Sequence, residues 1–409
     1  MTCPLEHPVV IVGAGPLGAA LALLLARRGV PVTLVERHRD FEREFRGEGL
    51  QPSGLACLHQ MGLDGPLAAV PQRTLERAEI VVGARTYAAR VPDDGLGRIR
   101  LVSQPHLLAM LCAEAARHPA FTLRMGAPVR DLVFESGRVA GVVLGGDEGG
   151  ELLRASFVIA ADGRTSALRR RLGVDIERSE QGFDVIWSRG DLGGLLPDDA
   201  TSRMEITDHH GIVAVFPAPA GGHQIGVIVP KGRHRDLRER GEAGSLAWLH
   251  GGVSPALAAA LRRAEPTMHR PVLLDVICGR AREWSRPGVI LLGDAAHPMS
   301  PVGGQGLNLA LRDAIVAANH LVPALLAGGD PAALDAAAAA IVAERRPEIE
   351  AIQAFQARQA RAFRPLGKLR RALLPYFLPL LLRLTPLARP FLRRRAAFRR
   401  GVAEIALRV

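Results

Sequence analysis

Three glycines near the start of the sequence have a spacing that suits phosphate chemistry. Gly13, Gly15 and Gly18 follow a β-branched run and open a stretch rich in alanine and leucine. In such a turn the first glycine permits a tight bend, the second lets the backbone approach a pyrophosphate, and the third lets helix and strand pack closely. Glu36 lies 18 residues after Gly18, at the end of the next β-branched run, where a carboxylate can accept hydrogen bonds from a ribose. These residues predict a dinucleotide site.

The segment 293–308 has a second pattern of this kind. It follows the apolar run 289–292 and places Asp294 directly after a glycine, where a carboxylate can hold the hydroxyls of a sugar-like chain. Gly303 and Gly304 then open a helix whose N–H groups and positive dipole end suit a ring that becomes anionic on reduction. Reduced flavin is such a ring. Taken alone, the segment is explained equally well by an ordinary glycine-rich helix start.

The elements that must position the first motif read as one βαβ unit. Residues 9–12 and 32–35 are apolar runs typical of strands that are buried on both faces. Residues 17–28 are rich in alanine and leucine, end in two arginines and precede Gly29, which are helix and helix-end signals. Because glycines and a proline interrupt the apolar run and no basic region precedes it, a signal peptide or a membrane anchor explains it less well.

The rest of the chain adds helices and a separate group of strands. Helices are expected at 52–61 and 105–117, and two strands across 124–144. Beyond about residue 171 the pattern changes to short strands, which are expected at 184–189, 203–207, 212–216 and 224–229. These strands predict a mostly antiparallel sheet inserted into the dinucleotide-binding fold.

Taken together, the motifs resemble a known enzyme family. GAGPLG with Glu36, Ala161-Asp162-Gly163 after the strand 157–160, and GDAAHPMSPVGGQGLN are similar to the three fingerprints of the FAD-dependent (class A) aromatic monooxygenases of the p-hydroxybenzoate hydroxylase type. The resemblance implies that the Asp162 segment takes part in both FAD and NAD(P)H binding. It also implies that Asp294 contacts the ribityl and pyrophosphate part of FAD. A purely turn-forming role is the alternative for Asp162.

The resemblance further implies that Arg46 and Gln104 line the FAD channel, although the family often has arginine where this chain has Gln104. The expected cofactor-binding residues are Gly13, Gly15, Pro16, Leu17, Gly18, Glu36, Arg37, Arg46, Gln104, Asp162, Gly163, Gly293, Asp294, Pro301, Gly303, Gly304, Gln305, Gly306, Leu307 and Asn308. No catalytic residue and no metal ligand can be named from the sequence.

The expected fold is an α/β Rossmann-like FAD-binding domain with an inserted, mostly antiparallel β-sheet substrate domain and a helical C-terminal region. Residues 1–170 are expected to form the first FAD-binding part with small inserted strands, and 171–285 the substrate domain. Residues 286–362 are expected to complete the FAD-binding domain with long helices, and 363–409 to form a basic, apolar helical tail.

The resemblance implies an enzyme in which NADH or NADPH reduces FAD, dioxygen adds at the flavin C4a, and the resulting hydroperoxide passes an oxygen atom to the substrate. Hydroxylation or epoxidation of an electron-rich, lipophilic aromatic, quinone, quinolone or polyketide compound is the expected reaction. Two alternatives stay open: an FAD-dependent oxidoreductase without oxygen insertion, and a membrane-associated, non-enzymatic nucleotide-binding adaptor. Flavin halogenases are related, but the sequence has no WxWxIP stretch.

The positive charge of the chain is concentrated at its C-terminal end. The net charge is +11, and residues 363–409 carry 12 Lys and Arg against one acid, so the preceding body is neutral. Nucleic-acid binding is therefore not expected, because a binding domain should carry its excess charge on its own surface. Within this tail, residues 366–392 mix apolar runs with arginines and prolines, which favours contact of residues 363–409 with a membrane surface, with packing of the tail against the body as the alternative. We expect a cytoplasmic protein, placed on the inner face of the membrane if the tail binds lipid.

Several residues that could suggest further chemistry have simpler interpretations. We expect His297 to be structural or near the flavin rather than a proton carrier, and His209-His210 not to bind metal, because neighbouring strand residues point to opposite faces. Cys57, Cys112 and Cys278 are expected to be small buried residues. Trp187 either faces the substrate or fills the core.

Overall fold

The computed structural model describes residues 5–42, 48–91, 97–145, 150–207, 211–232, 239, 248–249, 251–362 and 398–409. The expectations for Arg46, for His209-His210 and for residues 363–397 lie outside the described residues.

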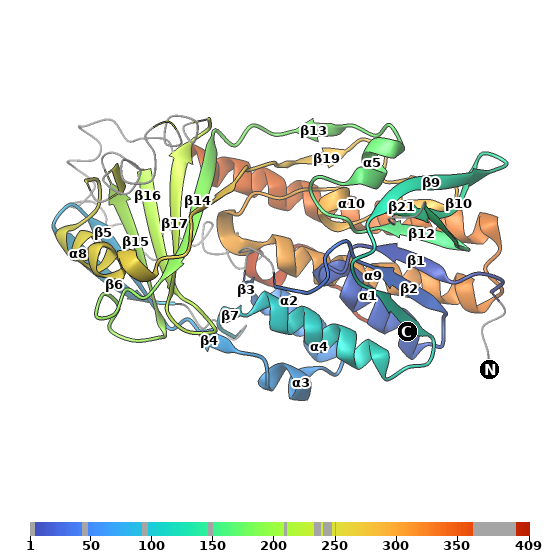
Figure 1. Cartoon of the computed structure of the whole chain (residues 1–409), viewed down its shortest axis with the longest axis horizontal. Helices are drawn as coiled ribbons and strands as arrows, with labels where there is room; N and C mark the ends of the chain where they lie inside the picture. Colours follow the sequence, from blue (N-terminus) through green and yellow to red (C-terminus); the bar gives the residue numbers. More distant parts are fainter. Residues whose placement is uncertain are drawn as a thin grey trace.

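A parallel sheet forms the centre of the larger half of the molecule, on the right of Figure 1. Its strand order is β20 (Ser285–Arg286), β21 (Val289–Leu291), β12 (Phe157–Ala160), β1 (Val9–Val12), β2 (Val32–Val35) and β8 (Phe121–Arg124). All neighbouring pairs are parallel except β20 with β21. Strands β1, β2, β12 and β21 are buried at every residue, which explains why the sequence shows them as continuous apolar runs. The strands expected at 9–12, 32–35, 157–160 and 289–292 are confirmed, the last ending one residue earlier.

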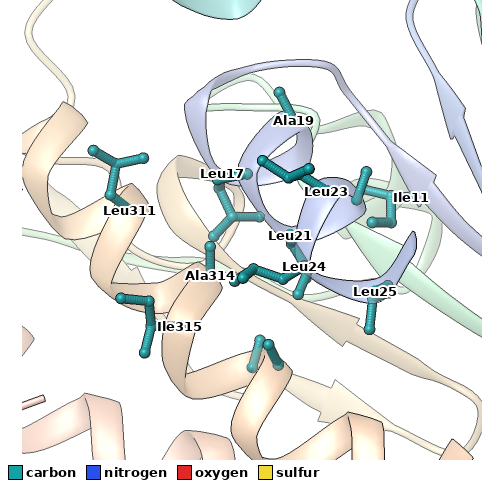
Figure 2. Close-up of a cluster of buried hydrophobic side chains, with 14 of the residues drawn as sticks. Ile11, Leu17, Ala19, Leu21, Leu23, Leu24, Leu25, Leu311, Ala314 and Ile315 are labelled. Carbon is teal, nitrogen blue, oxygen red and sulfur yellow. The ribbon is translucent and has the colours of Figure 1, made fainter. Parts of the chain in front are cut away.

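Helices cover one face of this sheet. They are α1 (Pro16–Arg27), α2 (Pro52–Gln60), α4 (Gln104–Ala116) and α9 (Gly306–Leu326), and α10 (Pro331–Ala362) packs on α9. Figure 2 shows the contact between α1 and α9, where leucines of α1 meet Leu311, Ala314 and Ile315. The helices predicted at 17–28, 52–61 and 105–117 are confirmed to within one residue at each end.

An antiparallel sheet covers the other face of the parallel sheet. It runs β11 (Glu151–Arg154), β10 (Arg138–Leu144) and β9 (Val129–Glu135), and β9 and β10 are the two strands expected across 124–144. Leu132, Val139 and Val142 of this sheet join Val10 and Val158 in one apolar cluster. The parallel sheet is therefore buried on both sides.

A second, mixed sheet lies on the left of Figure 1. Its order is β18 (Val272–Leu274), β14 (Phe183–Gly190), β17 (His223–Pro230), β16 (Gly211–Pro217), β15 (Thr201–Thr207), β5 (Arg77–Val82) and β6 (Arg85–Arg90). Neighbours are antiparallel except β15 with β5. The strands expected at 184–189, 203–207, 212–216 and 224–229 are all present and are one or two residues longer at their ends. Strands β5 and β6 reach this sheet from the range expected to belong to the first FAD-binding part.

Alternation along the strands gives the mixed sheet two different faces. One face places Val213, Val215, Ile225 and Val227 against leucines of α8 (Pro255–Ala264), in a closed apolar core. The opposite face carries Trp187 of β14. Its register partner on β17, Gly226, lies on the same face, and so does Ile228. This second face, the inner face, is turned toward the parallel-sheet half.

Short elements join the two halves. A small sheet of β3 (Gly49–Leu50), β7 (Arg100–Val102) and β4 (Gln72–Thr74) lies between them in Figure 1. The pair β13 (Ile176–Arg178) and β19 (Gly279–Ala281) makes a second connection. The remaining elements are α3 (Asp64–Ala68), α5 (Ala167–Arg171), and the 3-10 turns η1 (Glu265–Thr267), η2 (Gly293–Ala295) and η3 (Val302–Gly304).

The last twelve residues, 398–409, pack on the body of the protein. The ring of Phe398 lies 4.8 Å from that of Phe355, and the Leu407 N–H donates to the side chain of Gln60 at 2.7 Å. Residues 398–400 are helical, and those that follow are not. For this segment the packing alternative is therefore correct, whereas the membrane expectation for the rest of the tail stays a prediction. By length and composition alone Val302–Leu326 could cross a membrane, but 72% of its apolar window is buried in the core.

Candidate functional site

The glycine motifs meet at one edge of the parallel sheet. Strands β21, β12 and β1 are neighbours and run parallel, so their carboxyl ends lie side by side. Gly13, Asp162 and Gly293 follow these three ends. The first two turns touch, because a Cβ on Gly13 would overlap the carbonyl oxygen of Ala161. The third turn lies beside the first, because a Cβ on Gly293 would come within 3.6 Å of the Leu17 side chain. Segments that lie about 280 residues apart in the sequence therefore lie side by side.

The turn between β1 and α1 has the three glycine environments that the motif predicts. Gly13 has a φ of +106°, a backbone conformation that residues other than glycine rarely adopt. A Cβ on Gly18 would overlap the Gly13 carbonyl oxygen. At Gly15, by contrast, a Cβ would meet nothing within 4 Å. No side chain caps α1, whose first residue is Pro16, and the side chain of Leu17 is buried. The turn therefore presents backbone N–H groups to open space, as an anion site requires.

Glu36 ties the end of β2 to this turn. Its Oε2 accepts a hydrogen bond from the Ala14 N–H at 2.8 Å, and its Oε1 lies 2.6 Å from Nδ1 of His38. The carboxylate is only 4% exposed, whereas the neighbouring Arg37 is exposed. His38 was not among the expected residues, and it meets Glu36 because the chain bends directly after β2, where the His38 N–H also donates to Oε1 of Glu36 at 3.1 Å.

Asp162 has two roles, one for each oxygen. Its Oδ2 accepts hydrogen bonds from the N–H groups of Ala167 and Leu168 at 2.7 and 3.1 Å, which fixes the start of α5. Its Oδ1 is buried and has no hydrogen-bond partner among the described residues. At the adjacent Gly163, where φ is +82°, a Cβ would meet nothing within 4 Å. Burying an acceptor without a donor is costly, so Oδ1 fits a ligand that brings a hydroxyl.

The segment after β21 completes the edge. Asp294 lies in η2, and its Oδ2 is 3.6 Å from Nε of Arg164, which follows the Asp162-Gly163 pair. Both Gly303 and Gly304 have positive φ, and no side chain caps the helix α9 that follows them. The first N–H groups of α9 are therefore not capped by a side chain. The start of α1 has the same property.

Asn308 holds this loop against the strand β3. Its Oδ1 accepts a hydrogen bond from the Gln51 N–H at 2.8 Å, and its Nδ2 donates to the carbonyl oxygens of Gly49 and Gly304 at 3.0 and 2.7 Å. The neighbouring Gln305 turns away and donates to the Phe398 carbonyl at 3.0 Å. Asn308 thus positions the backbone of the glycine loop.

The remaining expected residues lie around this edge in different ways. Pro301 precedes η3 and is partly buried, Gly306 opens α9, and Leu307 is buried on it. Gln104 is buried at the first residue of α4.

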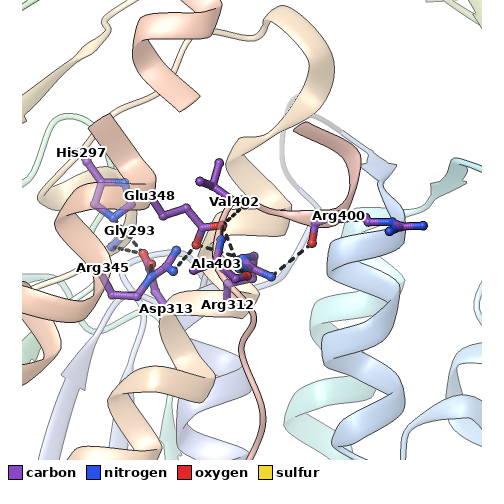
Figure 3. Close-up of polar contacts among 9 residues, drawn as sticks. All are labelled: Gly293, His297, Arg312, Asp313, Arg345, Glu348, Arg400, Val402 and Ala403. Atoms are coloured by element: carbon purple, nitrogen blue, oxygen red, sulfur yellow. Dashed lines mark hydrogen bonds and ion pairs between the residues drawn. The ribbon is translucent and has the colours of Figure 1, made fainter. Parts of the chain in front are cut away.

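A buried ionic network supports the edge from behind, and sequence reasoning missed it. Figure 3 shows Asp313 of α9 accepting hydrogen bonds from the Gly293 N–H at 3.2 Å and from Nε of Arg345 at 2.6 Å. Its Oδ2 also lies 2.8 Å from Nε2 of His297. Burial alone would raise the pKa of Asp313, but the charges of His297 and Arg345 lower it below its ordinary value. His297 is therefore a member of this buried network.

The same network reaches the C-terminal segment. Glu348 accepts hydrogen bonds from Nη2 of Arg312 and from the Val402 N–H at 2.7 and 2.8 Å, and it also pairs with Arg345. The available signal was the Arg312-Asp313 pair inside an otherwise apolar helix, because buried charges persist only when they are paired. The chain end is thereby fixed to the helices behind the glycine turns.

The inner face of the mixed sheet lies against the glycine loop. Trp187 and Ile228 pack in one apolar cluster with Val302 of η3. Trp187 is half-buried and lies over Gly226, so it both contributes to packing and borders the loop.

Glu48 is the buried acid at this junction. Nη2 of Arg189 donates to its Oε1 at 2.7 Å, and Nε2 of Gln224 donates to its Oε2. Burial raises the pKa of Glu48 to about 7, although the Arg189 charge and the hydrogen bond from Gln224 act in the opposite direction. Sequence reasoning missed Glu48, because its partners lie on distant strands.

Three cysteines lie among the described residues. Cys57, Cys112 and Cys278 are buried, as expected. Burial raises the pKa of the Cys57 thiol to about 12, so this residue stays protonated at neutral pH.

Comparison with known proteins decides the family. A family model described as an FAD binding domain matches residues 6–355. The chain is 36% identical over 394 residues to 6-methylpretetramide 4-monooxygenase of Streptomyces rimosus, covering 94% of this chain and 91% of that protein. The chain belongs to the FAD-dependent aromatic monooxygenases. Another member, protoasukamycin 4-monooxygenase of Streptomyces nodosus subsp. asukaensis, is 31% identical over 371 residues and covers 85% and 86% of the two chains.

Solved structures place this flavin monooxygenase in the same fold. The crystal structure of PqsL from P. aeruginosa in complex with 2-aminobenzoylacetate matches 87% of this chain and 96% of that chain, with a TM-score of 0.71 and 26% identity. The p-nitrophenol 4-monooxygenase PnpA of Pseudomonas putida DLL-E4 matches 99% and 100% with a TM-score of 0.79, and at 20% identity it shows the fold alone. The family resemblance inferred from the three motifs is therefore confirmed.

Proposed function

We propose that this flavin monooxygenase uses NADH or NADPH and dioxygen to hydroxylate or epoxidise a lipophilic, polycyclic aromatic substrate of the polyketide kind. The observation that carries the proposal is the convergence of three glycine-rich turns at one sheet edge, facing the apolar inner face of the mixed sheet. The two Streptomyces relatives, named for monooxygenation of 6-methylpretetramide and protoasukamycin, support this substrate class. Because the reductant is a cytoplasmic metabolite, we place the reaction in the cytoplasm.

The residues present fit FAD. Gly15 and the start of α1 would hold the pyrophosphate, since the turn offers N–H groups and the space of a missing Cβ. Glu36 would bind the adenosine ribose, and Asp162 the hydroxyls of the cofactor through its unpartnered Oδ1. Asp294 would serve the ribityl chain. When bound, FAD supplies the redox chemistry that activates dioxygen.

The loop that opens α9 would serve the redox ring. Gly303 and Gly304 turn the backbone so that the uncapped start of α9 faces the loop, and Asn308 holds that backbone in place. A helix N-terminus stabilises negative charge, which the ring acquires on reduction. This chain's own contribution here is a fixed set of N–H donors that needs no rearrangement during the reaction.

The mixed sheet would bind the substrate and exclude water. We propose that residues 171–285, together with β5 and β6, form the substrate side, because they build the inner face. Trp187 and Ile228 close one end of that face against Val302, while Met204 of β15 is 38% exposed at another position. Partly exposed apolar side chains can pack against a flat, lipophilic ring system.

An absorption spectrum and an isotope experiment test the proposal. The purified protein should show the bands of bound FAD, which NADH or NADPH bleaches under nitrogen and air restores. With a polycyclic phenol as substrate and 18O2 as oxidant, the product should carry one 18O atom. An oxidised product without the label would instead support the oxidoreductase alternative that inserts no oxygen.

Two substitutions locate the cofactor. Gly15→Val should fill the space left for the pyrophosphate, and Asp294→Ala should weaken the hold on the ribityl chain, so both should lower the flavin content of the purified protein. Gly65→Val is the matched control. A Cβ at Gly65 also meets nothing within 4 Å, but this residue lies in α3, away from the glycine turns. Normal flavin content in both Gly15→Val and Asp294→Ala would contradict the site.

A further inference from the structure

Glu48, Arg189 and Gln224 form a polar cluster, the Glu48 cluster, on the mostly apolar inner face. Arg189 of β14 and Gln224 of β17 are register partners, so their side chains share a face with Trp187. Glu48 meets them from another segment, directly before β3, and is 4% exposed. The side chain of Arg189 is 36% exposed, so its guanidinium group can reach a ligand that lies on this face.

The cluster lies beside the loop that we assign to the redox ring. Gly49, the next residue after Glu48, accepts the hydrogen bond from Asn308 at 3.0 Å. A Cβ on Gly304 would lie 4.0 Å from the same carbonyl oxygen. A substrate ring placed between the inner face and this loop would therefore have the Glu48 cluster at its edge.

We propose that Glu48 and Arg189 anchor an ionisable hydroxyl of the substrate, a phenol or an enol, with Glu48 accepting its proton and Arg189 binding the oxyanion. This inference rests on the proposed function and names the chemical class of its substrate. The O–H bond of the substrate breaks, an O–H bond forms on the carboxylate, and the electron pair stays on the substrate oxygen. Arg189 exchanges its carboxylate partner for the oxyanion, so the net charge of the site does not change.

This exchange suits both the site and the reaction. A buried oxyanion needs a cation and hydrogen bonds, and a guanidinium group offers both through five N–H donors. Ionising the hydroxyl makes the ring carbons ortho and para to it more electron-rich, which favours their attack on an electrophilic oxygen. Gln224 keeps Glu48 in position while the proton moves, because its amide contacts the oxygen that Arg189 does not.

The electrostatics of Glu48 support a proton acceptor at neutral pH. Its raised pKa of about 7 is due first to burial, and Arg189 is the charged group among the described residues that opposes this rise. Once Arg189 turns to the oxyanion, the carboxyl loses its counter-ion, and only the hydrogen bond from Gln224 still opposes the effect of burial. Glu48 would then hold the transferred proton more tightly than it does in the free protein.

The test uses the oxidised, FAD-loaded protein without NAD(P)H, so it needs no turnover. The probe is 2-naphthol, whose naphtholate has its own ultraviolet band, and 2-methoxynaphthalene is the matched ligand without the proton. Wild-type protein at pH 8 should bind 2-naphthol as naphtholate, at least about tenfold more tightly than the ether. Calorimetry in two buffers of different ionisation enthalpy should show that about zero protons are released, because Glu48 keeps the proton.

Variants separate the two roles. Glu48→Gln should release about one proton per naphtholate bound, because glutamine cannot take it. Arg189→Gln should bind 2-naphthol in its neutral form. Glu205→Gln is the control, since Glu205 is an equally buried partner of an arginine, Arg203, on the α8 face of the same sheet, and it should behave as the wild type does.

Two results would overturn the anchor. One is a wild-type complex that holds neutral 2-naphthol at pH 8, and the other is release of one proton by the wild type as well. Failure of the proposed function looks different, because the protein would then lack FAD bands or would form product without 18O. A protein with normal flavin and labelled product but neutral bound 2-naphthol would refute the anchor alone.

Discussion

The glycine turns of the parallel sheet and the Glu48 cluster of the mixed sheet lie on two sides of the same loop, yet they are built differently. The turns use backbone groups from short contiguous motifs, in which glycines leave the backbone uncovered. The Glu48 cluster uses side chains that are 141 and 176 residues away from Glu48 in the sequence. The first arrangement suits any dinucleotide, whereas we propose that the second recognises the substrate of this chain.

The two regions also differ in how charge is stabilised. Behind the turns, Asp313, Arg345 and Glu348 are fully buried, and Arg345 forms ion pairs with both acids, which hold the three charges in place. At the cluster, Glu48 is buried but its arginine partner is half-exposed, so the pairing can be exchanged. A rigid scaffold on one side and an exchangeable ion pair on the other suit a held cofactor and a changing substrate.

The largest expected effect concerns the stability that the buried network of Asp313, Arg345 and Glu348 gives to the protein. Arg345→Met leaves Asp313 and Glu348 buried without their shared cation, which should lower the free energy of unfolding by about 3 to 5 kcal/mol. Urea unfolding followed by circular dichroism measures this loss. Arg124→Met, which removes an exposed partner of Glu151, is the control and should leave stability near the wild-type value. Equal stability in both variants would mean that the network does not support the turns.

The next effect tests the exchangeable side through pH. The pKa of Glu48 is raised in the folded state, so the folded protein binds more protons than the unfolded chain between pH 4.5 and about 7, and stability falls as pH rises through this window. The rise to about 7 corresponds to a loss on the order of 3 kcal/mol. Glu48→Gln should lack this decrease. Parallel pH profiles of wild type and variant in chemical unfolding would argue against the raised pKa.

A pair of glycine substitutions then separates folding from binding within the turns. Gly18→Ala forces a Cβ into the Gly13 carbonyl and should cost about 2 kcal/mol of stability. Gly15→Ala meets open space and ordinary φ, so the protein without cofactor should keep its stability, while flavin retention falls. Thermal unfolding with and without added FAD distinguishes the two. Loss of apo stability in Gly15→Ala would place protein atoms, rather than a ligand, against that glycine.

The sequence predicted the parallel sheet well because its evidence is local. The run 9–12, the turn at Gly13 and the helix after Gly15 follow one another, so periodicity and turn chemistry identify them without tertiary knowledge. Adjacent parallel strands then bring Asp162 and Gly293 to the same edge, a placement that the fold class implies.

The rest depended on contacts between distant segments. Glu48, Arg189 and Gln224 each look ordinary in their local sequence, and only the register of β14 with β17 makes them neighbours. The role of β5 and β6 in the mixed sheet could not be inferred, because a strand's periodicity does not say which sheet it joins. The sequence likewise showed the charge of the C-terminal segment but not that Val402 would bond to Glu348.

The smallest expected effect concerns Gly226 of the mixed sheet. It tests whether this glycine leaves room for a protein side chain, in contrast to Gly15, which leaves room for the cofactor. A Cβ on Gly226 would lie 2.8 Å from the ring of Trp187, so Gly226→Ala should tilt the half-buried indole at a cost of about 1 kcal/mol. Flavin content should stay unchanged, while 2-naphthol affinity should fall by roughly threefold to tenfold because the inner face changes shape. Gly193→Ala, where the nearest atom is 3.6 Å away, is the control. If Gly226→Ala instead lost flavin and kept 2-naphthol affinity, the inner face would belong to the cofactor, and the division between the two regions would be wrong.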